Sequence, residues 1–128
     1  MALKKEKKGR HLLVDCWDVD REICLDDKRV LAIMTKAIKD AGFKEFNQVR
    51  YKFGHDSPPG FACVVMTLND GGHLSAHSYA DLGLIAIDVF TYRGINPRTI
   101  VKDIVSNLGT AKVTVREFKK IQLPSKRS

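Results

Sequence analysis

The stretch that most constrains the fold runs from residue 69 to residue 93 and reads NDGGHLSAHSYADLGLIAIDVFTYR. It opens with a Gly-Gly turn signal, continues with alternating polar and apolar residues, and then becomes almost wholly apolar. A turn of this kind between two extended segments predicts an antiparallel hairpin. Because side chains alternate along a strand, His73, Ser75 and His77 are expected on one face. That row is either the lining of a reaction site or an ordinary solvated strand face.

The rest of the chain alternates between strand and helix patterns. Asp26 or Asp27 is expected to cap a helix that Gly42 ends, and Asn96-Pro97 opens a second helix that Gly109 closes. Two helices can cover one face of a mainly antiparallel sheet, so we predict an α+β fold, a two-layer α/β sandwich. Its bare sheet face favours a homodimer. Strands are predicted at 11–17, 46–53, 61–68, 73–79, 84–92 and 112–118, and in the second of these Val49, Tyr51 and Phe53 share the side expected to be buried.

Length and charge exclude several classes of protein. A chain of 128 residues fits one domain, which we place at 11–119 between basic tails at 1–10 and 120–128. No apolar run reaches the ~20 residues that a membrane span needs, and residues 1–10 lack the apolar core of a signal peptide. The net charge of +7 is concentrated near the two ends, which argues against a specific nucleic-acid surface on the folded domain. Three cysteines without metal spacing indicate reduced thiols and a cytoplasmic protein.

The combination of GRHLLVD, a capped helix ending in Ala-Gly, and GHLSAHSYADLGLIAIDVFTYRG resembles the prokaryotic S-adenosylmethionine decarboxylases, from about Gly9 to Lys119. The resemblance implies a proenzyme in which a serine, immediately before the first histidine of a Ser-His-Leu-Ser/Thr-Ile-His motif, cuts the chain on its own N-terminal side. That serine becomes a pyruvoyl group, whose ketone forms a Schiff base with the substrate amine and accepts electrons as carbon dioxide leaves. The second histidine of the motif assists processing, and a cysteine after Phe-Thr donates a proton.

The chain departs from this pattern where the resemblance places the chemistry. Gly72 occupies the position of the serine, so no pyruvoyl cofactor is expected, and Tyr92 occupies the position of the cysteine. The catalytic candidates by position are therefore His77, His73, Ser75 and Tyr92. A phenol with an ordinary pKa near 10 can donate a proton but seldom accepts one at neutral pH.

The resemblance also implies a nucleoside site. Tyr79 and Asp81 stand where similar proteins have an aromatic residue and a glutamate that help to hold the nucleoside. Tyr79 can stack on a ring, and Asp81 can accept a hydrogen bond from a ribose hydroxyl. Asp88 is the one charged residue in its apolar strand, and we expect it to be paired with a positive group from a neighbouring strand.

Three functions follow from these observations. The first is a homologue that binds S-adenosylmethionine or a related nucleoside without decarboxylating it, as a sensor or as the partner of a paralogous subunit. The second is a lyase or hydrolase that acts on the sulfonium of the same ligand with a general base such as His77. The third is a decarboxylase that is cut at an unforeseen position, with Ser75 or Ser78 as the alternative hydroxyls. Fold alone does not choose among them, because activity belongs to the site.

Overall fold

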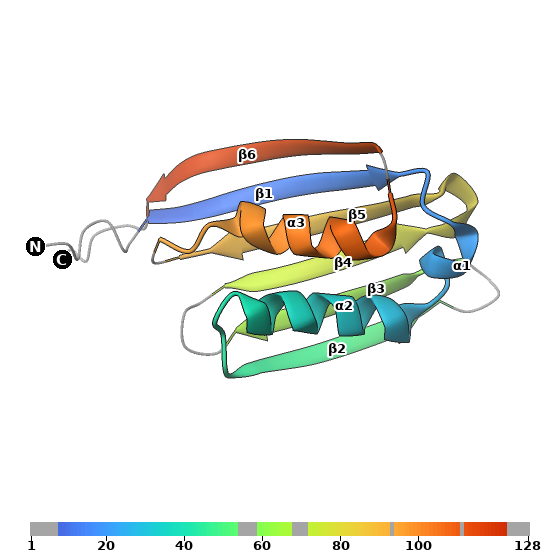
Figure 1. Cartoon of the computed structure of the whole chain (residues 1–128), viewed down its shortest axis with the longest axis horizontal. Helices are drawn as coiled ribbons and strands as arrows, with labels where there is room; N and C mark the ends of the chain where they lie inside the picture. Colours follow the sequence, from blue (N-terminus) through green and yellow to red (C-terminus); the bar gives the residue numbers. More distant parts are fainter. Residues whose placement is uncertain (1–7, 54–58, 68–71, 93, 111, 123–128) are drawn as a thin grey trace, which may run out of the picture.

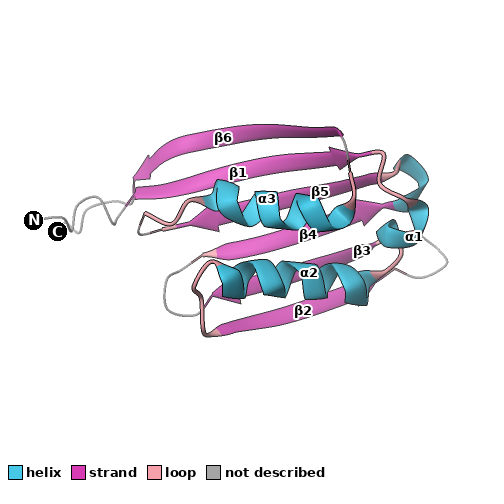
Figure 2. Cartoon of the chain, viewed as in Figure 1, coloured by secondary structure: helices cyan, strands magenta, loops and turns pink. Residues whose placement is uncertain are grey.

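One antiparallel sheet of six strands forms the back layer of the molecule, and two helices lie side by side in front of it (Figures 1 and 2). The computed structural model describes residues 8–53, 59–67, 72–92, 94–110 and 112–122, without the side chains of residues 8 and 119–122. The strand order β2-β3-β4-β5-β1-β6 confirms the predicted two-layer α/β sandwich. The elements are β1 (Lys8–Trp17), α1 (Arg21–Cys24), α2 (Asp27–Asp40), β2 (Phe46–Lys52), β3 (Phe61–Thr67), β4 (His73–Tyr79), a 3-10 turn (Ala80–Leu82), β5 (Leu84–Thr91), α3 (Pro97–Leu108) and β6 (Lys112–Gln122).

The two long helices begin and end where their capping residues predict. The Asp26 side chain accepts a hydrogen bond from the backbone N–H of Arg29 at 3.0 Å, which satisfies one of the free donors at the start of α2. The Asn96 side chain accepts from the backbone N–H of Arg98 at 2.9 Å at the start of α3. Gly109 ends α3 with φ 74°, a left-handed conformation that glycine adopts without steric cost.

The hydrophobic core lies between the helices and the facing side of the sheet. Helix α2 covers β2 and β3, while α3 covers β1 and β5 (Figure 1). Alternate residues of the four central strands point into this layer, as period-two geometry requires. They meet the apolar stripes of both helices, so folding removes large apolar side chains from water. The largest fully buried side chains are Phe61, Leu12, Met34, Leu74, Ile85, Ile100, Ile104, Leu108, Val14, Val30, Val65 and Val89.

The prediction that Val49 and Tyr51 are buried is wrong. Their side chains are 61% and 67% exposed, because β2 is an edge strand that turns its apolar side away from the helices. Beyond Phe46, which packs against the core, the helix-facing side of β2 is polar, and Arg50 donates to the nearly buried carboxylate of Asp27 at 2.5 Å. The sequence correctly grouped the β2 residues that share a face, but it predicted the wrong one of the two faces to be buried.

Two strands also extend further than the sequence predicts. Strand β1 starts at Lys8 rather than His11, and β6 continues to Gln122, opposite Lys8 in the ladder. Most of the predicted loop at 54–60 and of the predicted turn at 69–72 lies outside the described residues. Among the described residues, no helix combines the length and the apolar character needed to cross a bilayer.

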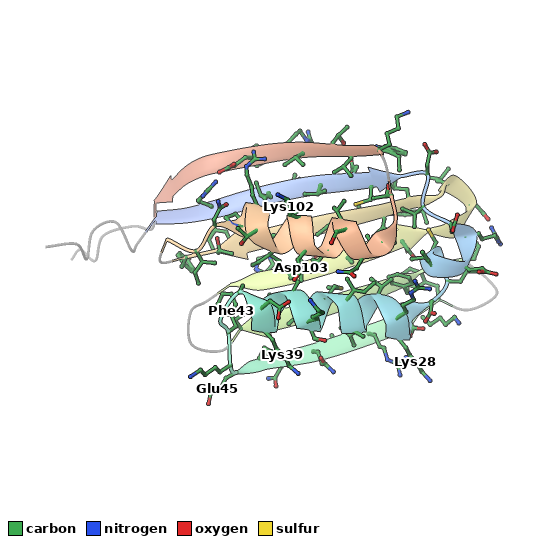
Figure 3. All side chains as sticks on the ribbon, viewed as in Figure 1. Lys28, Lys39, Phe43, Glu45, Lys102 and Asp103 are labelled. Atoms are coloured by element: carbon green, nitrogen blue, oxygen red, sulfur yellow. The ribbon has the colours of Figure 1, made fainter. Side chains whose placement is uncertain are left out.

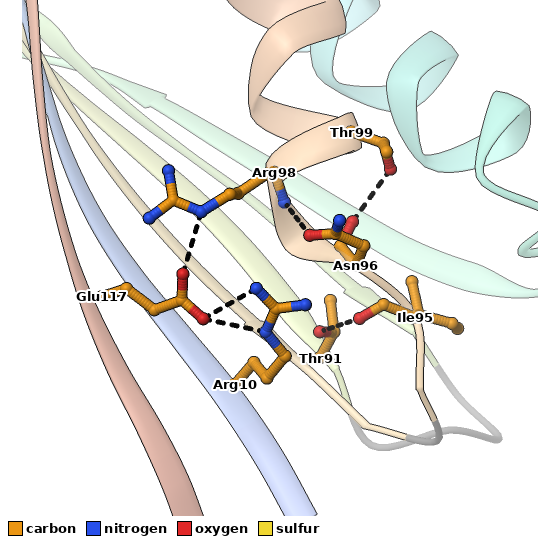
Figure 4. Close-up of polar contacts among 7 residues, drawn as sticks. All are labelled: Arg10, Thr91, Ile95, Asn96, Arg98, Thr99 and Glu117. Carbon is orange, nitrogen blue, oxygen red and sulfur yellow. Dashed lines mark hydrogen bonds and ion pairs between the residues drawn. The ribbon is translucent and has the colours of Figure 1, made fainter.

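Ion pairs join the edge strand β6 to β1 and α3 on the helix side of the sheet. Glu117 on β6 is only 5% exposed and accepts from Arg10 Nε at 2.8 Å and from Arg98 Nε at 2.9 Å (Figure 4). Burial alone would raise the pKa of Glu117, but the hydrogen bonds and charges of the two arginines outweigh it and lower the pKa. This contact ties three elements together, namely β1, α3 and β6. Other charged side chains of the helix layer, among them Lys28, Lys39 and Lys102, surround the helices in Figure 3.

Candidate functional site

The predicted site residues that belong to β4 all point to the sheet face opposite the helices. We call it the open face, because within the described residues no helix covers it. His73, Ser75, His77 and Tyr79 alternate with buried neighbours along β4 and therefore point to this face, as the sequence predicts. Strand pairing sets Phe90 of β5 directly opposite His73. Residues paired in this way form rows that run across the sheet.

Residues from five strands form the first row across the open face. In order from β3 to β6 it contains Met66, His73, Phe90, His11 and Phe118, each directly opposite the next. The two imidazole rings flank the central Phe90 ring, with centroid distances of 5.8 Å for His73 and 6.0 Å for His11. The sheet thus brings together two histidines that are far apart in the sequence.

Asp88 lies in the neighbouring row, two residues before Phe90 on β5. Its carboxylate approaches both imidazoles. Its Oδ1 atom lies 2.5 Å from Nε2 of His11 and 3.8 Å from Nε2 of His73. The partner that the sequence predicts on a neighbouring strand is therefore His11 of β1, an imidazole that carries a positive charge only when it is protonated. The Asp88 side chain remains 38% exposed, so the pair is half-buried rather than part of the core.

A row of aromatic rings crosses the other end of the open face. The centroid distances are 5.8 Å from Tyr51 to Phe53, 5.2 Å from Phe53 to His77 and 5.0 Å from His77 to Tyr79. The last two rings are stacked, with an interplanar angle of 15°. We call these four residues the ring row. A surface of this kind suits a planar, aromatic ligand group such as a nucleobase.

Gly72 sits in a tight backbone environment just before β4. Its N–H donates to Thr67 Oγ1 at 2.8 Å, and its carbonyl accepts from the hydroxyl of Thr67 at 2.9 Å and from the N–H of Thr67 at 3.0 Å. A Cβ atom added here would lie 2.8 Å from the carbonyl oxygen of Phe90. This position therefore lacks both the hydroxyl that a pyruvoyl group requires and the space for it. The residues present do not fit that cofactor.

The alternative hydroxyls and thiols near the motif have structural roles or are buried. Ser78 points into the core, where its hydroxyl donates to the Cys24 carbonyl at 2.7 Å and accepts from the Phe61 N–H at 2.9 Å. Ser75 faces the open face between Val64 and Asp88. The three cysteines are buried free thiols, and burial is the main cause that raises the pKa of Cys16 and of Cys63 to about 11. Such thiols are poor nucleophiles at neutral pH.

Tyr92 and Asp81, the other two predicted residues, lie at opposite ends of the sheet, Tyr92 after β5 and Asp81 in the 3-10 turn after β4. The Tyr92 ring packs against Phe90, 4.7 Å between centroids, and so joins the first row. Asp81 follows Tyr79 and forms an exposed ion pair with Arg21 of α1 at 2.9 Å. A ligand hydroxyl that binds Asp81 would therefore share the carboxylate with an arginine.

The sequence did not predict two residues of the open face, His11 and Phe53. His11 was assigned only to a strand, although it shares parity with Leu13 and Asp15, and Phe53 was assigned to the buried side of its strand. The parity of His11 was a usable signal, whereas its closeness to Asp88 depends on β1 and β5 being neighbours. Among the described residues, no group of three His, Cys, Asp or Glu side chains could hold a metal ion. A groove of about 150 Å³ between α2 and α3 contains none of the predicted site residues.

Comparison with known proteins gives the same assignment as the motif. The S-adenosylmethionine decarboxylase family model matches residues 10–121. The S-adenosylmethionine decarboxylase proenzyme of Pelotomaculum thermopropionicum is 32% identical over 91% of this chain and 89% of its own length. The proenzyme of Moorella thermoacetica is 33% identical over 88% of this chain and 86% of its own.

A solved structure supports the fold independently. The adenosylmethionine decarboxylase of Aquifex aeolicus superposes with a TM-score of 0.77 at 21% identity, covering 94% of this chain and 96% of that one. At this level of identity the likeness concerns the arrangement of helices and strands. Together with the match over most of the sequence, these findings show that the chain belongs to the S-adenosylmethionine decarboxylase family.

Proposed function

We propose that this chain binds S-adenosylmethionine or a closely related nucleoside on its open face and does not become a pyruvoyl enzyme. The observation that carries the second half is Gly72, which has no hydroxyl and no room for a Cβ beside the Phe90 carbonyl. The first half is supported by the ring row, which offers aromatic surface for a base, and by Asp81 at its end as a ribose acceptor. Its expected role is that of a sensor or of a modulating subunit.

Two measurements test this proposal. Intact-mass spectrometry of the purified protein is expected to show one uncut species, and two fragments with a ketone-capped second piece would establish pyruvoyl formation and overturn it. Thermal-shift titration with S-adenosylmethionine is expected to raise the melting temperature, since a ligand that binds only the folded state stabilises it. No shift at ligand concentrations far above the micromolar range would contradict nucleoside binding.

A matched pair of variants at Tyr79 locates the ligand. Tyr79→Phe keeps the ring and its stacking on His77, so the thermal shift is expected to persist. Tyr79→Leu keeps apolar bulk but loses the ring, and its affinity is expected to fall about fivefold, given that aromatic contacts contribute ~1 kcal/mol beyond buried area. Equal affinities for the two variants would place the ligand elsewhere.

We also propose that the open face is covered by a second copy of the chain. Several exposed apolar side chains of the described residues gather there, including Val49, Tyr51, Met66 and Phe118. A sheet face of this kind is stabilised by burial against a similar surface. Sedimentation analysis is expected to give a dimer, and Met66→Lys is expected to shift it toward monomer. A paralogous chain with the same face would compete, which co-purification of the two chains would detect.

A further inference from the structure

His11 and Asp88 form a carboxylate–imidazole pair at one end of the open face. We propose that His11 is the acid–base residue of this site, that Asp88 positions it, and that together they promote cleavage of a sulfonium carbon–sulfur bond by water. The inference rests on the proposed binding of S-adenosylmethionine to this face. It gives the open face a reaction that needs no pyruvoyl group.

The contact between the two side chains fixes how the imidazole can act. A carboxylate only accepts hydrogen bonds, so the 2.5 Å contact requires that His11 Nε2 carries the proton. In the neutral ring, Nδ1 is then left with a free lone pair and can take a proton. The rings of Phe90 and Phe118, each 6.0 Å away between centroids, restrict the plane of the imidazole. His11 is thus oriented by side chains from both neighbouring strands, β5 and β6, while its own side chain remains 28% exposed.

His77, which the motif designates for proton transfer, is placed differently. Its ring lies between Phe53 at 5.2 Å and Tyr79 at 5.0 Å, and it is nearly parallel to the latter. No carboxylate contact to His77 is present among the described side chains, in contrast to His11. The geometry therefore suits His77 for stacking and His11 for proton transfer.

The pair also lies close to the position that the family chemistry would use. Phe90 touches His11, His73 and Tyr92, and its carbonyl oxygen faces Gly72. The row with His11 is four residues along the strands from the row with His77, or about 13 Å at ~3.3 Å per residue. A nucleoside whose base rests on the ring row can extend an amino-acid chain in that direction.

The proposed step is balanced without a further reactant. A water molecule gives a proton to Nδ1 of His11, and its oxygen attacks a carbon bonded to the sulfonium. A carbon–oxygen bond forms, the carbon–sulfur bond breaks, and its electron pair neutralises the sulfur as a thioether. The imidazolium that results is stabilised by the Asp88 carboxylate and returns its proton to solvent.

Other charged groups share the open face with His11. They are Asp88 on β5, His73 on β4, Arg116 on β6 in the next row, and Asp15 on β1 itself. The proposed role requires the lone pair on Nδ1 of His11, so activity is expected to be lower in acid than at neutral pH.

The experiment measures thioether release from S-adenosylmethionine by chromatography, using full-length protein of verified intact mass. Wild type is expected to release methylthioadenosine, and His11→Gln is expected to lower kcat at least a hundredfold, the usual contribution of a general base. Asp88→Asn is expected to lower kcat ten- to a hundredfold and to move the acid limb of the pH profile, with recovery in Asp88→Glu. A merely structural role for Asp88 would leave the pH profile in place.

Two variants serve as comparisons. Asp15→Asn removes another carboxylate of the open face, on the strand that carries His11, and its kcat is expected to match that of wild type. His77→Gln is expected to raise KM with little change in kcat, because it alters the ring row. The inference is overturned if His11→Gln keeps its kcat, if His77→Gln loses it instead, or if wild type binds the ligand and releases no thioether. Absence of any ligand-induced thermal shift would instead refute the proposed binding.

Discussion

The two faces of the sheet are built from the same strands but on different principles. On the helix side, alternate residues of the central strands are fully buried, and ion pairs such as Arg10–Glu117 close the edge. On the open face, the alternate residues include histidines, aromatic rings and the Asp88 carboxylate, which contact each other and remain partly exposed. The comparison shows that the closely packed core lies on one face of the sheet, whereas the other face presents polar and aromatic groups at the surface.

The sharpest test of this difference uses neighbouring leucines in β1. Leu12 is fully buried against the helices, whereas Leu13 lies on the open face opposite Asp88. Leu12→Ala is expected to lower the free energy of unfolding by about 2–5 kcal/mol, while Leu13→Ala is expected to cost less than about 1.5 kcal/mol. Urea denaturation at one low protein concentration measures both. Equal losses would mean that the open face is as closely packed as the core.

Gly72→Ser tests whether the chain can regain family chemistry. The added Cβ meets the Phe90 carbonyl at 2.8 Å, so we expect a destabilisation of about 1–3 kcal/mol and no chain cleavage. Gly72→Ala is the control, because it adds the same Cβ without a hydroxyl. Intact mass and urea denaturation give both readouts, and efficient cleavage of the serine variant would show that the site is still preformed.

Glu117→Gln tests the electrostatic contribution of the helix side. The pKa of Glu117 is lowered by Arg10 and Arg98 in the folded state, so this stabilisation is fully present above the unfolded-state pKa. It is lost as pH falls from about 5 through the lowered pKa, where the carboxylate takes up a proton. We expect wild type to be about 1–2 kcal/mol more stable at pH 7, discounted because Arg98 is half exposed.

The pH dependence distinguishes this contact from general acid denaturation. Urea midpoints measured from pH 7 to pH 3 are expected to converge for wild type and Glu117→Gln at the acidic end. Asp27, whose pKa Arg50 lowers against the opposing effect of burial, keeps part of the acid slope in both proteins. Parallel curves at every pH would show that the charge of Glu117 contributes nothing.

The smallest effect on stability is expected at the exposed pair between Arg21 and Asp81. Both side chains are more than half exposed, so Arg21→Gln is expected to change the free energy of unfolding by less than about 0.5 kcal/mol. Because the substitution releases Asp81 for a ribose hydroxyl, nucleoside affinity is expected to rise severalfold. A lower affinity would indicate that Arg21 itself contacts the ligand.

The sequence alone determined the elements and part of the site. Period-two and helical patterns identified all six strands and both long helices, and the capping residues placed the helix ends, because these are local properties of the chain. The same parity put His73, Ser75 and His77 on one face. The absence of a hydroxyl at Gly72 is also a fact of the sequence.

Only the tertiary structure decided which side of each strand the helices cover. For that reason Val49 and Tyr51 were placed on the wrong side, although their shared parity was correct. Likewise, His11 reaches Asp88 because β1 inserts beside β5, and residues 77 positions apart become neighbours. Strand order is set by the packing of the whole chain, so a local pattern carries no record of it.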